Sequence, residues 1–112
     1  MTFQEKYNEL SRKLRETEEQ LKQLTIDVLI SKGADSEENA YCYEDDTPYL
    51  NVEGKYSPTE VTVDKIWFNE DEGLMALLTP TGFDDPWEQN LEDLTSYVSY
   101  ADILWFMDLS EE

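Results

Sequence analysis

The stretch from Val61 to Thr79 constrains the fold more than any other part of the chain. Two runs of apolar and β-branched residues, 61–68 and 74–79, flank a five-residue polar turn that ends at Gly73. Such runs joined by a short polar turn are typical of a β-hairpin. Gly73 can adopt the positive φ that closes a type I turn with a bulge. Because apolar residues occur on both faces of both runs, we expect other segments to cover the hairpin on two sides.

Weaker strand signals precede this hairpin. Residues 40–43 form a short apolar run inside an acidic, turn-rich segment, and residues 49–52 form a better one. The sequence therefore predicts a small antiparallel sheet of three or four strands. A chain of 112 residues is long enough for one domain with a modest core.

Residues 2 to 31 are predicted to form one long helix. Thr2 and Glu5 have the spacing of a capping box, and Gly33 is a suitable C-terminal stop. Apolar residues recur at alternating spacings of three and four, as in a heptad seam interrupted only by Thr17. These residues are Phe3, Tyr7, Leu10, Leu14, Leu21, Leu24 and Val28. A helix of this length would span about 45 Å, so its first part must project from the body or find a partner.

The seam gives two alternatives for the first helix. In one, the seam residues mediate a homodimer; they are Tyr7, Leu10, Leu14, Leu21 and Leu24. In the other, residues 3 to 21 fold back on the C-terminal helices and bury the seam within one chain. We favour the homodimer, because the helix outruns the body that it would have to cover.

The C-terminal part, residues 86 to 109, is predicted to be helical. Asp85 can cap a helix that begins at Pro86, with Glu88 as the reciprocal partner, and Ser99 marks a second start. The pattern leaves open whether this part is one bent helix or two. The residues expected in the core are Trp67, Phe68, Leu77, Leu91, Leu94, Ile103, Leu104 and Phe106. The predicted fold class is α+β: a long N-terminal helix (1–32), a small antiparallel sheet and short C-terminal helices in a single domain.

The charge is extreme and unevenly distributed. The net charge is −19. Residues 1–32 hold six acidic and six basic residues, so residues 33–112, with 21 acids and two lysines, account for all of it. A chain this acidic is repelled by nucleic acids and by anionic membranes, so we expect neither as a direct partner. Basic proteins are the expected partners.

Catalysis and cofactor binding find little support in the sequence. The chain contains no histidine and a single cysteine, Cys42, which removes the commonest general base and any thiolate metal site. Placing Gly73 at position 6 of a calcium loop would put Phe68 at position 1, so the EF-hand pattern fails. No apolar run reaches the roughly 20 residues that a membrane span needs, and no signal peptide is evident. We expect a cytoplasmic protein that is not an enzyme and has no metal or cofactor.

Two acidic clusters are the candidate contact surface for a basic partner. Their members are Glu70, Asp71 and Glu72 in one cluster, and Asp84, Asp85, Glu88, Glu92 and Asp93 in the other. A simple role in solubility would explain such residues. The sharper hypothesis is a surface that imitates the anionic backbone of a nucleic acid and inhibits a nucleic-acid-binding enzyme. Some small acidic proteins of phages and mobile elements act in this way, which is an analogy of class only. The alternative is a small acidic domain that associates through its N-terminal helix.

Overall fold

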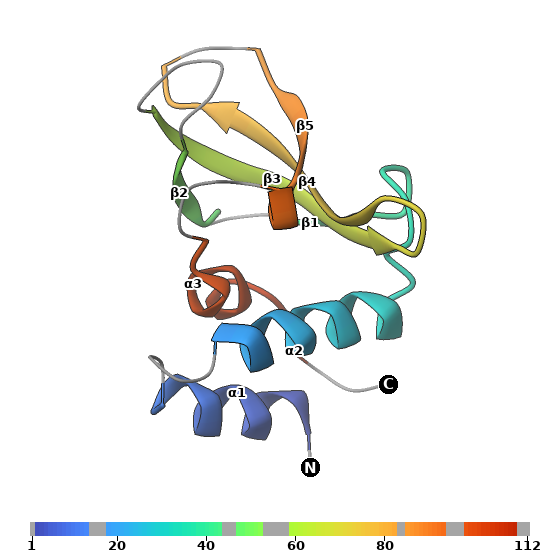
Figure 1. The fold of residues 1–112 in the computed structure, drawn as a ribbon, viewed down its shortest axis with the longest axis vertical. Coiled ribbons are helices and arrows are strands. Elements are labelled where there is room, and N and C mark those ends of the chain that lie inside the picture. The colour runs from blue at the N-terminus through green and yellow to red at the C-terminus, as the bar shows by residue number, and fades with distance from the viewer. Residues whose placement is uncertain are drawn as a thin grey trace.

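The structure is a computed structural model that describes residues 2–13, 18–43, 47–52, 59–82, 85–93 and 98–109. Within these residues the chain forms an antiparallel sheet of five strands, three α-helices and one 3-10 turn. The strands are β1 (Tyr41–Cys42), β2 (Tyr49–Val52), β3 (Thr59–Asn69), β4 (Gly73–Pro80) and β5 (Trp87–Asn90). The helices are α1 (Phe3–Ser11), α2 (Glu18–Ser31) and α3 (Tyr100–Trp105), with the 3-10 turn η2 (Leu91–Asp93). The predicted α+β class is therefore confirmed, and Figure 1 shows the sheet on one side of the molecule and the helices on the other.

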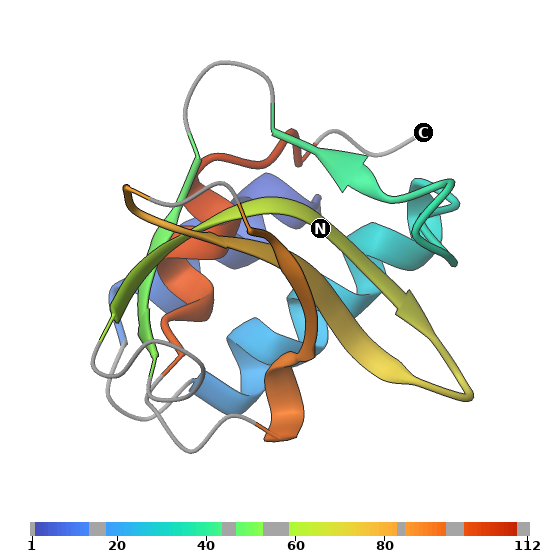
Figure 2. The same cartoon turned by 90° about the horizontal axis from the view of Figure 1, so that it is seen from above.

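The predicted hairpin is present as β3 and β4. Asn69 pairs with Gly73 across the turn, and Gly73 has a φ of 84°. The Asn69 side-chain oxygen accepts a hydrogen bond from the Glu72 backbone N–H at 2.6 Å, which holds the turn from inside. The register shifts between Val63 and Lys65, as at a β-bulge. Such a bulge increases the local twist, in keeping with the curved sheet of Figure 2.

Strand β3 is the centre of the sheet. Strands β1 and β2, which match the short strands expected at 40–43 and 49–52, pair with different parts of β3, while β4 pairs with its other edge. Strand β5 then adds to β4. The expectation of three or four strands is wrong by this fifth strand, because residues 87–90 were expected in a helix. Two apolar residues four apart, Trp87 and Leu91, fit a helix, but the free edge of β4 offers backbone hydrogen bonds that a local pattern does not report.

One face of the sheet is buried against the helices. Alternate residues of β4 are fully buried on that face: Leu74, Ala76, Leu78 and Pro80. The other face is only partly covered, since Met75 and Leu77 are half-buried there. Trp67, which pairs with Met75, is nevertheless 1% exposed. The expected cover on two sides is thus complete on one face and partial on the other.

The N-terminal segment is two helices, so the prediction of one long helix is wrong. Helix α1 ends at Ser11, Arg12 and Lys13 form a turn, and α2 begins at Glu18. The two helices pack side by side, and α1 also contacts α3. Folding back buries the apolar stripe of α1 within the chain, which an isolated helix would leave in water. The molecule measures only 40 × 31 × 29 Å as a result.

The predicted helix ends are confirmed at three places. Thr2 and Glu5 form both hydrogen bonds of the capping box at the start of α1. Gly33, with a φ of 73°, ends α2, where its N–H binds the Ile30 carbonyl and the Ala34 N–H binds the Leu29 carbonyl. This pair of bonds is a Schellman motif. At α3 the Ser99 hydroxyl accepts from the Asp102 N–H.

The predicted core is confirmed for four of its eight members. Trp67, Leu91, Ile103 and Leu104 are buried. Of the others, Phe68 and Leu77 are half-buried, Phe106 is exposed, and Leu94 lies outside the described residues. Phe106 differs because α3 ends at Trp105, and the chain beyond it turns with Met107 inward.

Candidate functional site

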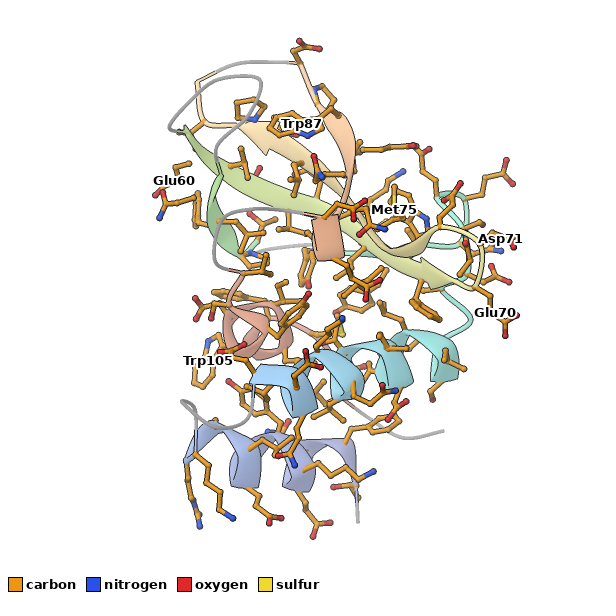
Figure 3. All side chains as sticks on the ribbon, in the orientation of Figure 1. Glu60, Glu70, Asp71, Met75, Trp87 and Trp105 are labelled. Carbon is orange, nitrogen blue, oxygen red and sulfur yellow. The ribbon has the colours of Figure 1, made fainter. Side chains whose placement is uncertain are left out.

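The turn between β3 and β4 presents three carboxylates to solvent. Glu70, Asp71 and Glu72 are exposed at its tip, and Figure 3 shows Glu70 and Asp71 pointing away from the body of the protein. The turn is fixed by Asn69 from inside. From β5, the Asn90 side-chain amide donates a hydrogen bond to the Glu72 carbonyl. The first acidic cluster is therefore held on a well-anchored turn.

Glu88 lies in a cluster of three carboxylates from three separate segments. It is exposed on β5, opposite Leu77 of β4. A hydrogen bond with the side chain of Glu37 is the main cause that raises the pKa of Glu88 above its ordinary value of 4.5, because two carboxyl groups can share such a bond only while one of them keeps a proton. Desolvation and the negative charges of Glu37 and Glu72 raise it further. We call Glu37, Glu72 and Glu88 the carboxylate cluster.

Glu92 is a structural residue. Its carboxylate lies 2.6 Å from the Lys22 ammonium of α2 and accepts a hydrogen bond from the Leu74 N–H at 3.5 Å. The hydrogen bond from Lys22 is the main cause that lowers the pKa of Glu92. This carboxylate joins η2 to α2 and to the start of β4 while it stays exposed to solvent, and its predicted contact with a partner stays a prediction.

The remaining described members of the second acidic cluster come from different segments, one before β5 and one in η2. Asp85 and Asp93 are exposed, and Asp84 lies outside the described residues. The expectation that Asp85 caps a helix at Pro86 is wrong, because β5 follows. Glu88 and Glu92 are likewise not like-charge neighbours on one helix, since one is in a strand and the other in a 3-10 turn.

Glu37 is the functional candidate that the sequence did not identify. It lies in the acidic, turn-rich segment between α2 and β1, and only the tertiary fold brings it to Glu88. The sole sequence signal was the acidity of that segment, which many other segments of this chain share.

The predicted dimer seam is largely buried inside the chain. Tyr7, Leu21 and Leu24 are buried, and the Tyr7 hydroxyl donates to the Ala101 carbonyl of α3 at 3.3 Å. Leu10 packs against the core, and Leu14 lies outside the described residues. These contacts match the alternative in which the seam is internal. The homodimer stays a prediction, but its assumed surface is occupied by the protein itself.

A groove of about 360 Å³ lies between α1 and α2. Its polar lining includes Lys6 and Lys13 together with Glu9 and Asp27, above the apolar side chains of Leu10 and Leu24. The charges balance, so the groove has no preference of sign for a ligand. It belongs to the neutral part of the chain rather than to the acidic body.

Neither a metal site nor a membrane-spanning helix is found in the described part of the chain. Its histidine, cysteine and acidic residues form no group of three that could hold a metal ion. None of its helices is long and apolar enough to cross a membrane. Cys42 is a free, exposed thiol on β1.

Comparisons with known proteins give no relative for this chain. No protein-family profile, no curated protein and no solved structure matches it. The arguments on function therefore depend on the chain's own charges and contacts.

Proposed function

We propose that this protein is a non-enzymatic interaction module whose anionic surface binds a basic protein. The carboxylate cluster is the observation that carries the proposal. Glu37 from the segment after α2 and Glu72 from the β3–β4 turn both raise the pKa of Glu88 on β5, so the three carboxyl groups lie within electrostatic range of Glu88. A neighbouring cation would lower that pKa. The fold therefore brings acidic groups of separate segments together around Glu88.

Charge of this kind has a cost for the isolated protein and a use in a complex. Like charges held together destabilise the folded state, and a cationic surface placed against them removes that repulsion. Nucleic acids and anionic membranes, which are themselves negatively charged, would increase that repulsion. Within the class of basic proteins, we propose a nucleic-acid-binding enzyme, whose cleft is already shaped for a row of negative charges and which this protein would inhibit by occupying it.

A matched pair of double variants tests this proposal. Glu72→Gln with Glu88→Gln removes two charges from the carboxylate cluster, while Glu9→Gln with Glu19→Gln removes two exposed charges from α1 and α2. Each immobilised protein is incubated with host lysate at about 50 and about 500 mM NaCl, since exposed charges are strongly screened at the higher concentration. A basic protein retained by the wild type at low salt is then identified and purified.

The proposal expects that partner to be lost at high salt and in the cluster variant, and retained by the control variant. The purified partner should also release a labelled nucleic acid when this protein is added. Recovery of no basic protein at low salt would refute the proposal. Equal binding of the partner by the two double variants would show that the contact does not involve the carboxylate cluster.

A further inference from the structure

Two exposed aromatic side chains lie at the C-terminal end of helix α3. Trp105 is 68% exposed and Phe106, the residue that caps the helix, is 37% exposed. Asp102 is one turn earlier and is also exposed. Positions i, i+3 and i+4 are neighbours on a helix surface, so Trp105 and Phe106 each lie beside Asp102. We call Trp105 and Phe106 the aromatic corner.

The opposite face of α3 already supplies the packing that this short helix needs. Tyr100, Ile103 and Leu104 are buried, and the chain continues inward with Met107. The aromatic corner is therefore surplus to the core. In Figure 3 Trp105 points outward from α3, on the other side of the molecule from Glu70 and Asp71. Tryptophan is enriched where proteins bind one another and depleted from surfaces that only face water.

The charge of the molecule decides what can cover this corner. A second copy would bring two bodies of net charge −19 together, and nucleic acids or anionic membranes would be repelled in the same way. Asp102 adds a carboxylate beside the aromatics, and Asp108, 4.0 Å from the Lys32 ammonium, follows just after them. A surface that combines aromatics with acids is complementary to an apolar pocket bordered by lysine or arginine.

We propose that the aromatic corner anchors the protein to a basic partner by inserting Trp105 into an apolar pocket rimmed with cationic side chains. This inference rests on the proposed function for the partner's charge and adds a contact that charge alone does not supply. Such a contact is short-ranged, so it should persist at salt concentrations that screen the exposed carboxylates.

Two synthetic peptides of equal length and charge test the inference. One places leucines on one face of an amphipathic helix and lysines on the other. The second peptide replaces every leucine with serine. Each is titrated into the wild type, into Trp105→Ala, into the conservative Trp105→Tyr, and into Ile30→Ala. Ile30 is the matched control, since it is a 60% exposed apolar residue of α2. Thermal unfolding verifies that all four proteins are folded.

The inference expects the lysine–leucine peptide to bind Trp105→Ala at least about tenfold more weakly than the wild type, as for a central aromatic anchor. Trp105→Tyr should recover most of this loss, Ile30→Ala should show none, and the lysine–serine peptide should not distinguish the variants.

If both peptides bind and Trp105→Ala changes neither, the inference is wrong while the proposed function stands. If neither binds at low salt, both fail. Self-association of the wild type, or binding to zwitterionic vesicles, that is abolished by Trp105→Ala would overturn the inference in favour of a second copy or a lipid surface.

Discussion

Glu88 and Glu92 are four residues apart, and the fold shifts their pKa values in opposite directions. The pKa of Glu88 is raised mainly by its hydrogen bond with Glu37, and the pKa of Glu92 is lowered mainly by its hydrogen bond with Lys22. A raised carboxyl pKa means that the folded state binds the proton more tightly than the unfolded chain. The stabilisation from Glu88 is then present below the unfolded-state pKa and is lost as the pH rises through the folded-state pKa. For Glu92 it is present above the unfolded-state pKa and is lost as the pH falls through the folded-state pKa.

Two single substitutions should therefore show opposite pH profiles. Glu92→Gln should lower the free energy of unfolding by about 1 kcal/mol at neutral pH, a modest loss because solvent partly screens the pair. That loss should disappear in acid. Glu88→Gln should leave the protein equally or more stable at neutral pH and less stable than the wild type in acid. Urea unfolding between about pH 3 and pH 7 measures both, in the range where carboxyl groups titrate.

Asp93→Asn is the control for these two variants. Asp93 follows Glu92 in η2 and is exposed, so its neutralisation should cost nothing at any pH in this range. A loss for Asp93→Asn as large as that for Glu92→Gln would mean that the local charge of η2, and not the contact with Lys22, is responsible.

At the scale of the element, helix ends and the hairpin were predictable because their signals are local. Thr2 with Glu5, Gly33 and Gly73 each act through their own backbone or a side chain a few residues away. The break after Ser11 was not predictable, because no glycine or proline marks it and the heptad spacing continues through it. Packing of α1 against α2 and α3 decides that break, and such contacts depend on residues far away in the sequence.

The candidate functional residues divide along the same line. The acids of the β3–β4 turn were identified because they are adjacent in the sequence. The ion pair of Glu92 was not predicted, since Lys22 is 70 positions earlier, and Glu37 was missed for the same reason. The exposed Phe106 was expected in the core because an apolar run does not show where a helix ends. Charge can thus be predicted from composition, whereas pairing and exposure require the fold.

The β3–β4 turn yields a prediction, because side chains of Asn69, Asn90 and Glu92 all bind its backbone or the start of β4. A Cβ atom added at Gly73 would lie 2.7 Å from the Glu92 carboxylate, and the φ of 84° is unfavourable for alanine. Gly82 has a similar φ of 86° with nothing within 4 Å. Gly82→Ala should therefore cost about 1–2 kcal/mol of stability from backbone strain alone, and Gly73→Ala should cost more, because it also displaces Glu92 from Lys22.

Combining Gly73→Ala with Glu92→Gln separates the two contributions. If displacement of Glu92 causes the excess cost, the double variant should lose less than the sum of the single losses, whereas Gly82→Ala with Glu92→Gln should be additive. Urea unfolding of the six proteins provides the comparison. Equal losses for Gly73→Ala and Gly82→Ala would show that the turn moves freely enough to admit a methyl group.

At the scale of the whole molecule, the two halves of the chain differ in charge but share one core. Helices α1 and α2 belong to the neutral segment 1–32 and lie on one side, and the sheet belongs to the acidic segment 33–112 and lies on the other. Lys22 pairs with Glu92, and Lys32 lies near Asp108 and 5.7 Å from the ring centre of Tyr41. These contacts attach Lys22 of α2 and Lys32, which follows α2, to the acidic body, while the chain as a whole keeps its net charge of −19.

That excess charge should make stability depend on salt. Self-repulsion destabilises the compact state, and screening relieves it. The urea midpoint of unfolding should therefore rise steadily as NaCl is increased from about 10 to about 300 mM, over which the Debye length falls from about 30 Å to well under 10 Å. Sodium sulfate at the same ionic strength should give the same increase at the low end, where screening and not ion exclusion dominates. Glu72→Gln with Glu88→Gln should reduce the salt dependence, since it removes repulsion from the carboxylate cluster. A midpoint that falls with salt would instead show that attractive pairs such as Lys22–Glu92 dominate the electrostatics of the fold, and that the negative charge is better compensated than the carboxylate cluster indicates.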